Sequence, residues 1–225
     1  MKNLIKISFL MLAVTMFVAC KNTKGEEAKV SDKVEKSTDA KGTSYAVAAD
    51  ASIIAWNATK TLGGGHNGTI KISEGSVTVD GGAVVGGNFT IDMNSISVLD
   101  IEDAGKRGYL ETHLKGLDDK SADDFFNVNK YPTAKYEITK VIKKEGDENA
   151  NSLVYGNLTL RDITKSVSFS ANINVADGVV NVNTPDFKFD RTEFGIKYNS
   201  PSFFDDLKEK AINNDVGLNV TLVAK

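Results

Sequence analysis

Residues 88–94 read NFTIDMN, an alternation that puts Phe89, Ile91 and Met93 on one side of an extended chain and polar residues on the other. A period of two is typical of a β-strand with one buried face. The same alternation recurs in residues 69–72, 76–79, 154–160, 167–175, 180–182, 187–189 and 216–222. The chain from Tyr45 onward is therefore predicted to consist almost entirely of strands.

Short turns separate these strands. Asp80-Gly81-Gly82 and Asp177-Gly178 are hairpin signals, and Glu74-Gly75 is read as a further turn. Strands linked in this way form a sandwich or a closed barrel, and closure leaves no exposed edge. We expect an all-β fold, an antiparallel β-barrel of eight or so strands. One or two short helices are expected in addition, within residues 101–130 and 202–212.

The first twenty residues read MKNLIKISFLMLAVTMFVAC and carry an export signal. Two lysines precede an apolar run, Phe9–Ala19, that has the length of a secretory signal and is too short to span a bilayer. The closing FVAC resembles a bacterial lipobox, in which the cysteine is acylated. An ordinary signal peptide with an incidental cysteine is the alternative. We predict a lipoprotein signal peptide at residues 1–19 and lipidation, including palmitate, at Cys20.

The predicted anchor places the protein in the bacterial cell envelope. Lys21 rather than Asp follows the cysteine, which favours the outer membrane, at its periplasmic face or at the cell surface. Residues 20–44 are expected to form the lipidated Cys20 and a flexible tether, because they contain no aromatic residue and few aliphatic ones.

Composition excludes several classes of function. The 225 residues carry a net charge of −3, whereas a nucleic-acid-binding protein would show a basic face. One cysteine excludes an internal disulfide, and two histidines leave little material for a metal site. No metal, cofactor or nucleic acid is therefore expected.

A series of motifs carries a family resemblance. They follow Trp56 in the order His66-Asn67-Gly68, Gly86-Gly87-Asn88-Phe89, His113-Leu114-Lys115, Asp124-Phe125-Phe126, Gly156-Asn157-Leu158 and Asp190-Arg191-Thr192. Together they resemble the YceI-like family over residues 45–225. The resemblance implies a lipocalin-like eight-stranded antiparallel β-barrel that binds a polyisoprenoid or a related long amphiphile in its bore. In the family the His-Leu-Lys motif runs almost directly into Asp-Phe-Phe. Here the segment Gly116 to Asp123 intervenes, and we expect it to reshape one barrel mouth.

The inward faces have two readings, a solid core or the wall of a ligand cavity, and the resemblance favours the cavity. The larger inward residues are the candidate ligand-binding residues: Phe89, Ile91, Met93, Tyr136, Ile138, Leu158, Leu160, Phe169, Phe187 and Phe189. Candidate headgroup or mouth residues are Trp56, His66, His113, Phe125, Phe126 and Arg191. Each histidine also has a structural reading, as does Arg191, whose guanidinium can satisfy backbone carbonyls at a tight corner.

The sequence favours a non-catalytic protein that carries, buffers or senses a long-chain isoprenoid or fatty lipid. An enzyme would need an activated nucleophile or an acid–base pair, and no such motif stands out. A lipid-modifying enzyme and a structural envelope protein with a filled barrel remain as alternatives. The expected partners are the lipid ligand, a membrane reached through the N-terminal anchor and a possible second copy in a homodimer.

Overall fold

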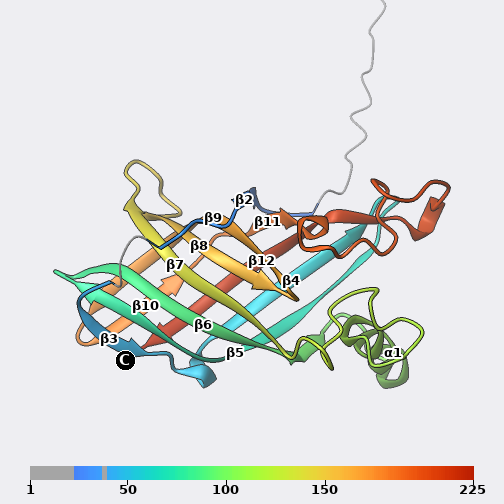
Figure 1. Cartoon of the computed structure of the whole chain (residues 1–225), viewed down its shortest axis with the longest axis horizontal. Coiled ribbons are helices and arrows are strands. Elements are labelled where there is room, and N and C mark those ends of the chain that lie inside the picture. Colours follow the sequence, from blue (N-terminus) through green and yellow to red (C-terminus); the bar gives the residue numbers. More distant parts are fainter. Residues whose placement is uncertain (1–22, 37–39) are drawn as a thin grey trace, which may run out of the picture.

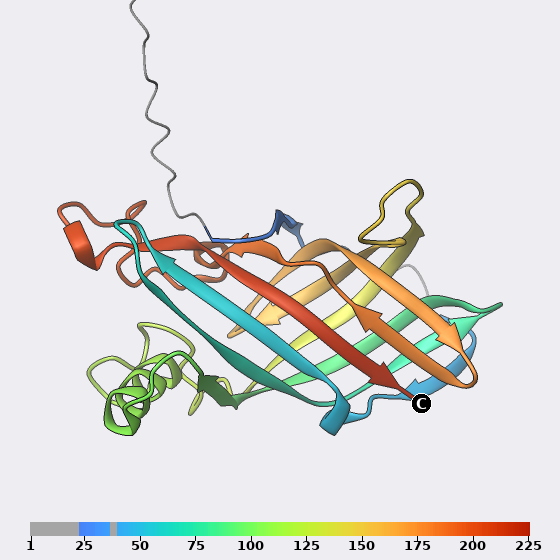
Figure 2. The same cartoon turned by 180° about the vertical axis from the view of Figure 1, so that it is seen from behind.

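The computed structural model describes residues 23–36 and 40–225. Eight antiparallel strands close into a barrel (Figures 1 and 2). They are β4 (Ile53–Lys60), β5 (Gly65–Asp80), β6 (Ala83–Val98), β7 (Thr133–Lys143), β8 (Ser152–Leu160), β9 (Ile163–Ala176), β10 (Val179–Asn183) and β12 (Ile212–Ala224). Each pairs with its neighbour in this order, and β12 returns to β4. The expected eight-stranded barrel is confirmed.

Register explains why the alternating residues meet inside. Phe89 pairs with Tyr136, and Tyr136 pairs with Leu158, so the three side chains form a row across β6, β7 and β8. The prediction of a turn at Glu74-Gly75 is wrong, because β5 continues through it with a bulge between Ile72 and Glu74. A glycine inside a strand often marks a bulge or a close backbone approach. Here a Cβ on Gly75 would lie only 2.5 Å from the Asn88 carbonyl oxygen.

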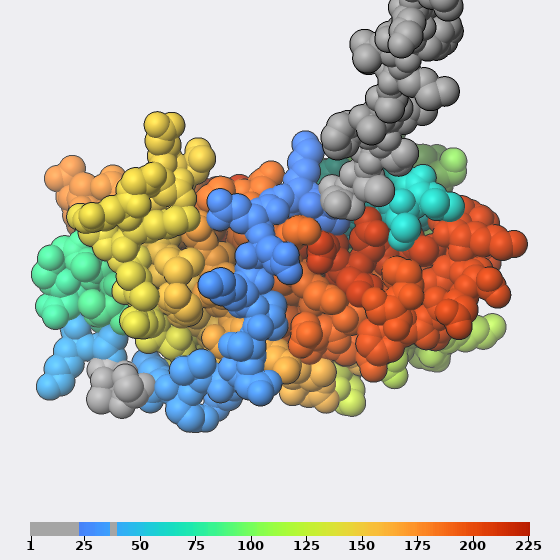
Figure 3. Space-filling model, turned by 90° about the horizontal axis from the view of Figure 1, so that it is seen from above, coloured from blue at the N-terminus to red at the C-terminus, as the bar shows by residue number. Residues whose placement is uncertain are grey.

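The N-terminal segment supplies an additional piece of the barrel wall. It contains β1 (Glu26–Glu27), which runs parallel to β11 (Phe187–Asp190), and β2 (Lys29–Asp32), which pairs antiparallel with β9. We call residues 26–32 the strap. The strap lies between β9 and β11 on the outside of the molecule, as the blue chain crossing Figure 3 shows.

This pairing differs from the flexible tether expected for residues 20–44, within the part that the structure describes. The prediction of a tether rests on the scarcity of apolar side chains that could be buried. The strap is instead held by backbone hydrogen bonds, such as the one from the Ala28 amide to the Lys188 carbonyl at 2.8 Å. Ala28 is nevertheless buried among the core residues. The strand β3 (Thr43–Ala46) also begins inside the expected tether and pairs with β5. Small and polar residues thus complete the wall through their backbones.

One α-helix stands at an end of the barrel. The helix α1 (Ala104–Lys115) begins after Asp103, whose side chain accepts the Lys106 amide, and ends at Gly116 in the left-handed conformation, φ 66°. This confirms the helix predicted within residues 101–130. In residues 202–212 the structure has only a 3-10 turn, η3 (Lys208–Lys210), instead of a second helix. The other 3-10 turns are η1 (Ala49–Ala51) and η2 (Arg191–Phe194).

Within residues 23–36 and 40–225, none of the helices combines the length and apolar character needed to cross a membrane. The predicted signal peptide and the predicted lipidation at Cys20 lie outside the described residues.

Candidate functional site

The barrel encloses two adjoining cavities, with volumes of about 120 Å³ and about 110 Å³. We call them the α1-side cavity and the distal cavity. Both are lined by Ile54, Ile91, Leu158, Phe189 and Leu218, so these five side chains form the partition between them. The interior therefore holds two apolar chambers that meet at these five side chains.

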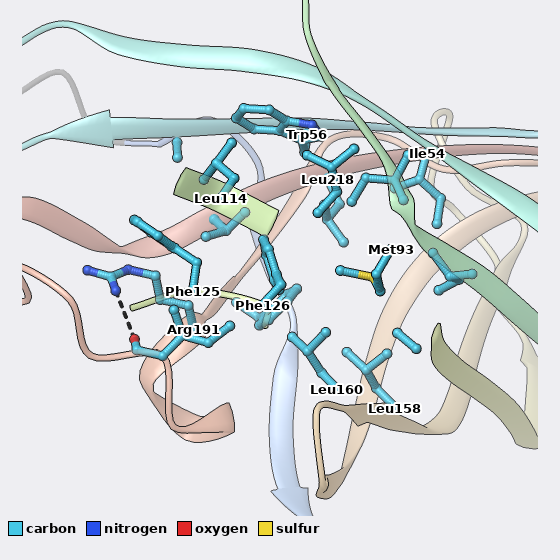
Figure 4. A pocket seen from close by; sticks show the side chains of 18 of the residues that line it. Ile54, Trp56, Met93, Leu114, Phe125, Phe126, Leu158, Leu160, Arg191 and Leu218 are labelled. Atoms are coloured by element: carbon cyan, nitrogen blue, oxygen red, sulfur yellow. Dashed lines mark hydrogen bonds between the residues drawn. The ribbon is translucent and has the colours of Figure 1, made fainter. Parts of the chain in front are cut away.

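The α1-side cavity is covered by α1 and by the chain that follows it. Leu114, Phe125 and Phe126 reach into the same space as Met93 and Leu218 from the barrel wall (Figure 4). The Phe126 amide donates to the Leu114 carbonyl at 3.2 Å, which fixes the returning chain to the end of the helix.

The inserted segment, Gly116 to Asp123, is consequently a loop whose two ends are held together by hydrogen bonds. Gly116 to Asp123 leaves the end of α1 and returns before Phe125 and Phe126 enter the cavity wall. The Val128 amide closes the loop by donating to the Lys115 carbonyl at 2.8 Å. The segment lies at the end of the barrel that carries α1, and its expected reshaping of a barrel mouth stays a prediction.

The distal cavity has an aromatic wall. The Phe169 ring stacks on Phe187 with centroids 4.4 Å apart, and Tyr136 lies 5.5 Å from Phe169. The Tyr136 hydroxyl donates to the Val167 carbonyl at 3.0 Å, and burial raises the pKa of Tyr136 far above its ordinary value. Gly156 leaves room for this ring, since a Cβ there would run into it. The phenol is thus neutral and satisfied, and the chamber remains apolar.

All ten candidate ligand-binding residues line the two cavities. Met93 and Leu160 line the α1-side cavity, and Ile91, Leu158 and Phe189 line both. The remaining five line the distal cavity: Phe89, Tyr136, Ile138, Phe169 and Phe187. Of the candidate mouth residues, Trp56, Phe125, Phe126 and Arg191 line the α1-side cavity, whereas His66 and His113 do not.

The two histidines form polar contacts away from the bore. His66 Nδ1 lies 2.9 Å from Asp100 Oδ2 at the surface. Partial burial acts to raise the pKa of Asp100, but hydrogen bonds from the Asn67 amide and from His66 outweigh it and lower that pKa below its usual range. His113 Nε2 lies 2.9 Å from Asp124 Oδ2, and its ring packs edge-on against Phe125. His113 therefore packs against Phe125, a residue of the cavity wall, without lining the cavity itself.

The Arg191 guanidinium is committed to backbone carbonyls. It donates to Ile196 at 2.8 Å, to Tyr198 at 2.9 Å, and to Ile212 and Asn213 at 3.2 Å. Burial lowers the pKa of Arg191, and the neighbouring Asp190 opposes that shift. These contacts fit the structural reading of Arg191, and only its side-chain stem adds to the cavity wall.

Sequence reasoning missed part of the lining. Ile54, Ile212, Leu218, Val220 and Leu222 come from β4 and β12, the strands that close the barrel. The alternation in residues 216–222 marks Leu218, Val220 and Leu222 as inward-facing, and side-chain size does not separate the two leucines from the candidates Leu158 and Leu160. Ala28 of the strap belongs to the core and not to the lining of either cavity, and the residues around it show no hydrophobic alternation that could have predicted its burial.

Polar chemistry in the bore is sparse. Among the described side chains, only Trp56 Nε1 and Arg161 Nε are buried nitrogen or oxygen atoms without a hydrogen-bond partner. Trp56 belongs to the α1-side lining, and its side chain is labelled in Figure 4. Within the same described ranges, no group of three or more His, Cys, Asp and Glu side chains is placed to hold a metal ion.

Comparison with known proteins gives a consistent result. A UPF0312 protein of Pseudomonas putida is 29% identical over 108 residues, which are 48% of this chain and 49% of the relative. Protein YceI of Salmonella newport is 34% identical over 108 residues, 47% of this chain and 48% of the relative. The chain thus spans about half the length of the curated relatives it matches.

Two solved structures share the fold. Burkholderia cenocepacia BcnA aligns with a TM-score of 0.59 at 19% identity, covering 80% of this chain and 99% of that one. A polyisoprenoid binding domain from Saccharophagus degradans, implicated in plant cell wall breakdown, aligns with a TM-score of 0.53 at 14% identity, covering 80% and 97%. The sequence profile of the YceI-like domain matches residues 45–224. The closed barrel and this match together show that the chain belongs to the YceI-like domain family.

Proposed function

We propose that the protein binds a long-chain apolar ligand, a polyisoprenoid or a related amphiphilic lipid, inside the barrel and acts without catalysis as a carrier, buffer or sensor in the cell envelope. The observation that carries this proposal is the pair of adjoining cavities whose walls are apolar side chains. The structural similarity to a polyisoprenoid binding domain of Saccharophagus degradans supports the same ligand class.

The energetics favour a flexible hydrocarbon chain. Each CH₂-sized group removed from water contributes roughly 0.8 kcal/mol, so a five-carbon unit contributes about 4 kcal/mol before ordering costs. A chain that occupied both chambers would run past the side chains that the two linings share, such as Ile91 and Leu158. Trp56 Nε1, buried and without a protein acceptor, would suit one ligand oxygen at the α1 end.

Membrane attachment through a lipidated Cys20 is part of the proposal. The chain carries a net charge of −3, and loss of Lys2 and Lys6 with the signal would make it more negative by two. Attraction to anionic headgroups is therefore a poor anchor, whereas multiple acyl chains hold a protein firmly.

Native mass spectrometry of the detergent-free protein purified from its own host tests the ligand. We expect the chain to carry the mass of a long-chain lipid. Phe89→Asp should abolish the adduct, because it introduces a charge into an apolar chamber. Asn88→Asp is the matched control, since Asn88 is the exposed neighbour on the same strand. Folding of both variants is followed by circular dichroism.

Each alternative predicts a different spectrum. Chemical conversion of the bound lipid that disappears in His113→Ala or Asp190→Ala would support a lipid-modifying enzyme. An adduct-free chain with a rigid barrel would support a structural envelope protein and would overturn the proposed binding role.

A further inference from the structure

Large apolar side chains are exposed at the end of the barrel that carries α1. Leu62 is 73% exposed, Phe203 48% and Phe204 51%. Leu62 lies in the turn between β4 and β5, and the two phenylalanines lie in the chain between η2 and β12. Figures 1 and 2 show the red 199–211 segment and the β4–β5 turn at the same end of the barrel.

The two segments are joined, and their base is fixed. The Thr61 amide donates to the Ala211 carbonyl at 3.0 Å. Ser200 is fully buried, and its carbonyl accepts the amides of Phe203 and Phe204 at 3.1 and 3.0 Å. The exposed aromatic rings therefore project from an ordered loop. We call Leu62, Phe203 and Phe204 the apolar tip.

The described part of the chain begins beside this tip. Thr23, where the description of the chain begins, is buried, and its Oγ1 lies 2.9 Å from Thr59 Oγ1. It also donates to the Asp215 carbonyl at 3.0 Å. Thr59 precedes the Leu62 turn by only three positions. Cys20, the predicted lipidation site, precedes Thr23 by only three positions, so a lipid on it would be attached close to the apolar tip.

The charge around the tip is nearly balanced. Residues 197–211 contain Lys197, Lys208 and Lys210 together with Asp205, Asp206 and Glu209, and Lys60 beside the Leu62 turn adds one positive charge. A border with so little net charge does not select an anionic membrane or a strongly charged protein partner. It suits the zwitterionic headgroup region of a phospholipid bilayer, where aromatic and leucine side chains insert.

The tip is also connected to the wall of the bore through the chain. The 199–211 segment leads directly into Ile212, which lines the α1-side cavity, and Ile196 shortly before the segment lines the same cavity. A bilayer in contact with the tip would therefore lie at the end of the barrel where this cavity is found.

From these relations we infer that the apolar tip docks on the surface of a lipid bilayer, with Leu62, Phe203 and Phe204 inserted among the headgroups. The occupant is the membrane itself, and the docked orientation brings the α1 end of the bore to the lipid. The exchange of ligand between the membrane and the bore rests on the proposed function, whereas the docking of the tip does not.

The test uses the full chain reconstituted in phosphatidylcholine vesicles whose acyl chains carry bromine, which quenches tryptophan fluorescence at short range. Phe203→Trp and Leu62→Trp report from the tip. Ile142→Trp is the control, because Ile142 is 38% exposed and lies at the end of β7 that is remote from α1. The native Trp56 is buried and contributes equally to all variants.

We expect tip variants to be quenched at least about twofold more than the Ile142→Trp variant, with emission shifted to shorter wavelength. Equal quenching at both ends, or none at either, would overturn the inference. A blue shift without vesicles, accompanied by a doubled mass in light scattering, would also overturn it, because a second copy would then cover the tip. Phe204→Glu should remove the quenching while the bore keeps its lipid adduct, which separates docking from ligand binding.

Discussion

Phe169 on β9 and Phe187 on β11 stack with their ring planes inclined by only 9°. In the described chain no strand ladder joins β9 directly to β11, and the strap lies between them. The stacked rings close this seam from within, and the strap closes it from outside. Both rings also border a space under the strap that is lined by Glu26, Ala28 and Ser170. The aromatic pair therefore separates the bore from the underside of the strap.

Replacing Phe187 by alanine removes one of the two rings. Phe187 is 4% exposed, so the change should lower the free energy of unfolding by roughly 3–5 kcal/mol. Urea unfolding followed by circular dichroism measures the loss, and Ile142→Ala, at an exposed position, should change stability by far less. A loss below about 1 kcal/mol would mean that the ring does not close the seam.

The strap depends on the small side chain of Ala28, which is 6% exposed. Ala28→Asp would place a carboxylate among core residues, and we expect the strap to detach while the barrel persists. Limited trypsin digestion should then cleave faster at Lys24, Lys29 and Lys33. Lys29→Asp, on the exposed side of the strap, serves as the control and should not loosen the neighbouring sites. Equal cleavage of the two variants would contradict the prediction.

Tyr136 makes stability sensitive to alkali. Its folded pKa is raised by burial, so the folded state stays neutral above pH 10 while the unfolded chain ionises. Stability is therefore present below about pH 10 and falls by about 1.4 kcal/mol for each further pH unit. Tyr136→Phe loses the hydrogen bond to Val167 but also loses this sensitivity. Guanidinium unfolding at pH 8 and pH 11 should show the variant losing less stability than the parent.

Asp100 has the opposite dependence. Its folded pKa is lowered, so its stabilising contribution is present above the unfolded value of about 3.9 and disappears as the pH falls through the folded one. We expect Asp100→Asn to melt at a lower temperature than the parent at pH 7 and to approach it near pH 2. Melting curves across this range check the sign. A difference that grows in acid would refute the assigned hydrogen bonds from His66 and Asn67.

Arg191 holds the corner after β11 through four backbone carbonyls. Arg191→Met would leave these acceptors unpaired and should cost about 3 kcal/mol or more, or prevent folding. Arg191→Lys should recover part of the loss, because an ammonium restores some of the donors. If Arg191→Met unfolds at the parent's urea concentration while its bound lipid is lost, the guanidinium acts on ligand and the structural assignment fails.

Much of the barrel follows from local pattern. The alternation around Phe89, Ile91 and Met93 fixes which face is inward, and Asp80-Gly81-Gly82 and Asp177-Gly178 form the hairpins that they predict. The rows of Phe89, Tyr136 and Leu158 follow once neighbouring strands pair. The alternation and the hairpins depend on residues close in sequence, which explains why they could be predicted, whereas the row joins residues far apart in the chain.

The strap and the cavity partition could not be read in the same way. The strap pairs Glu26 with Phe187 and Lys29 with Ser168 across more than a hundred residues, and backbone hydrogen bonds leave no side-chain pattern. Whether Leu158 fills the core or divides two chambers depends on the distance to Ile54 and Leu218 on the other wall. The sequence could not decide between a structural and a ligand-binding role for Arg191 for a related reason. The carbonyls that accept its hydrogen bonds lie on segments that only the folded chain brings together.

The strap has a practical consequence for how this domain is handled. The family match begins at residue 45, and a chain trimmed to that limit would lack residues 26–32. It would expose two bare strand edges that face each other across a slit beside Phe169 and Phe187. Unprotected edges recruit other strands. If such a truncated protein formed dimers or fibres, or lost bound lipid, the cause would be the missing strap rather than a property of the native molecule.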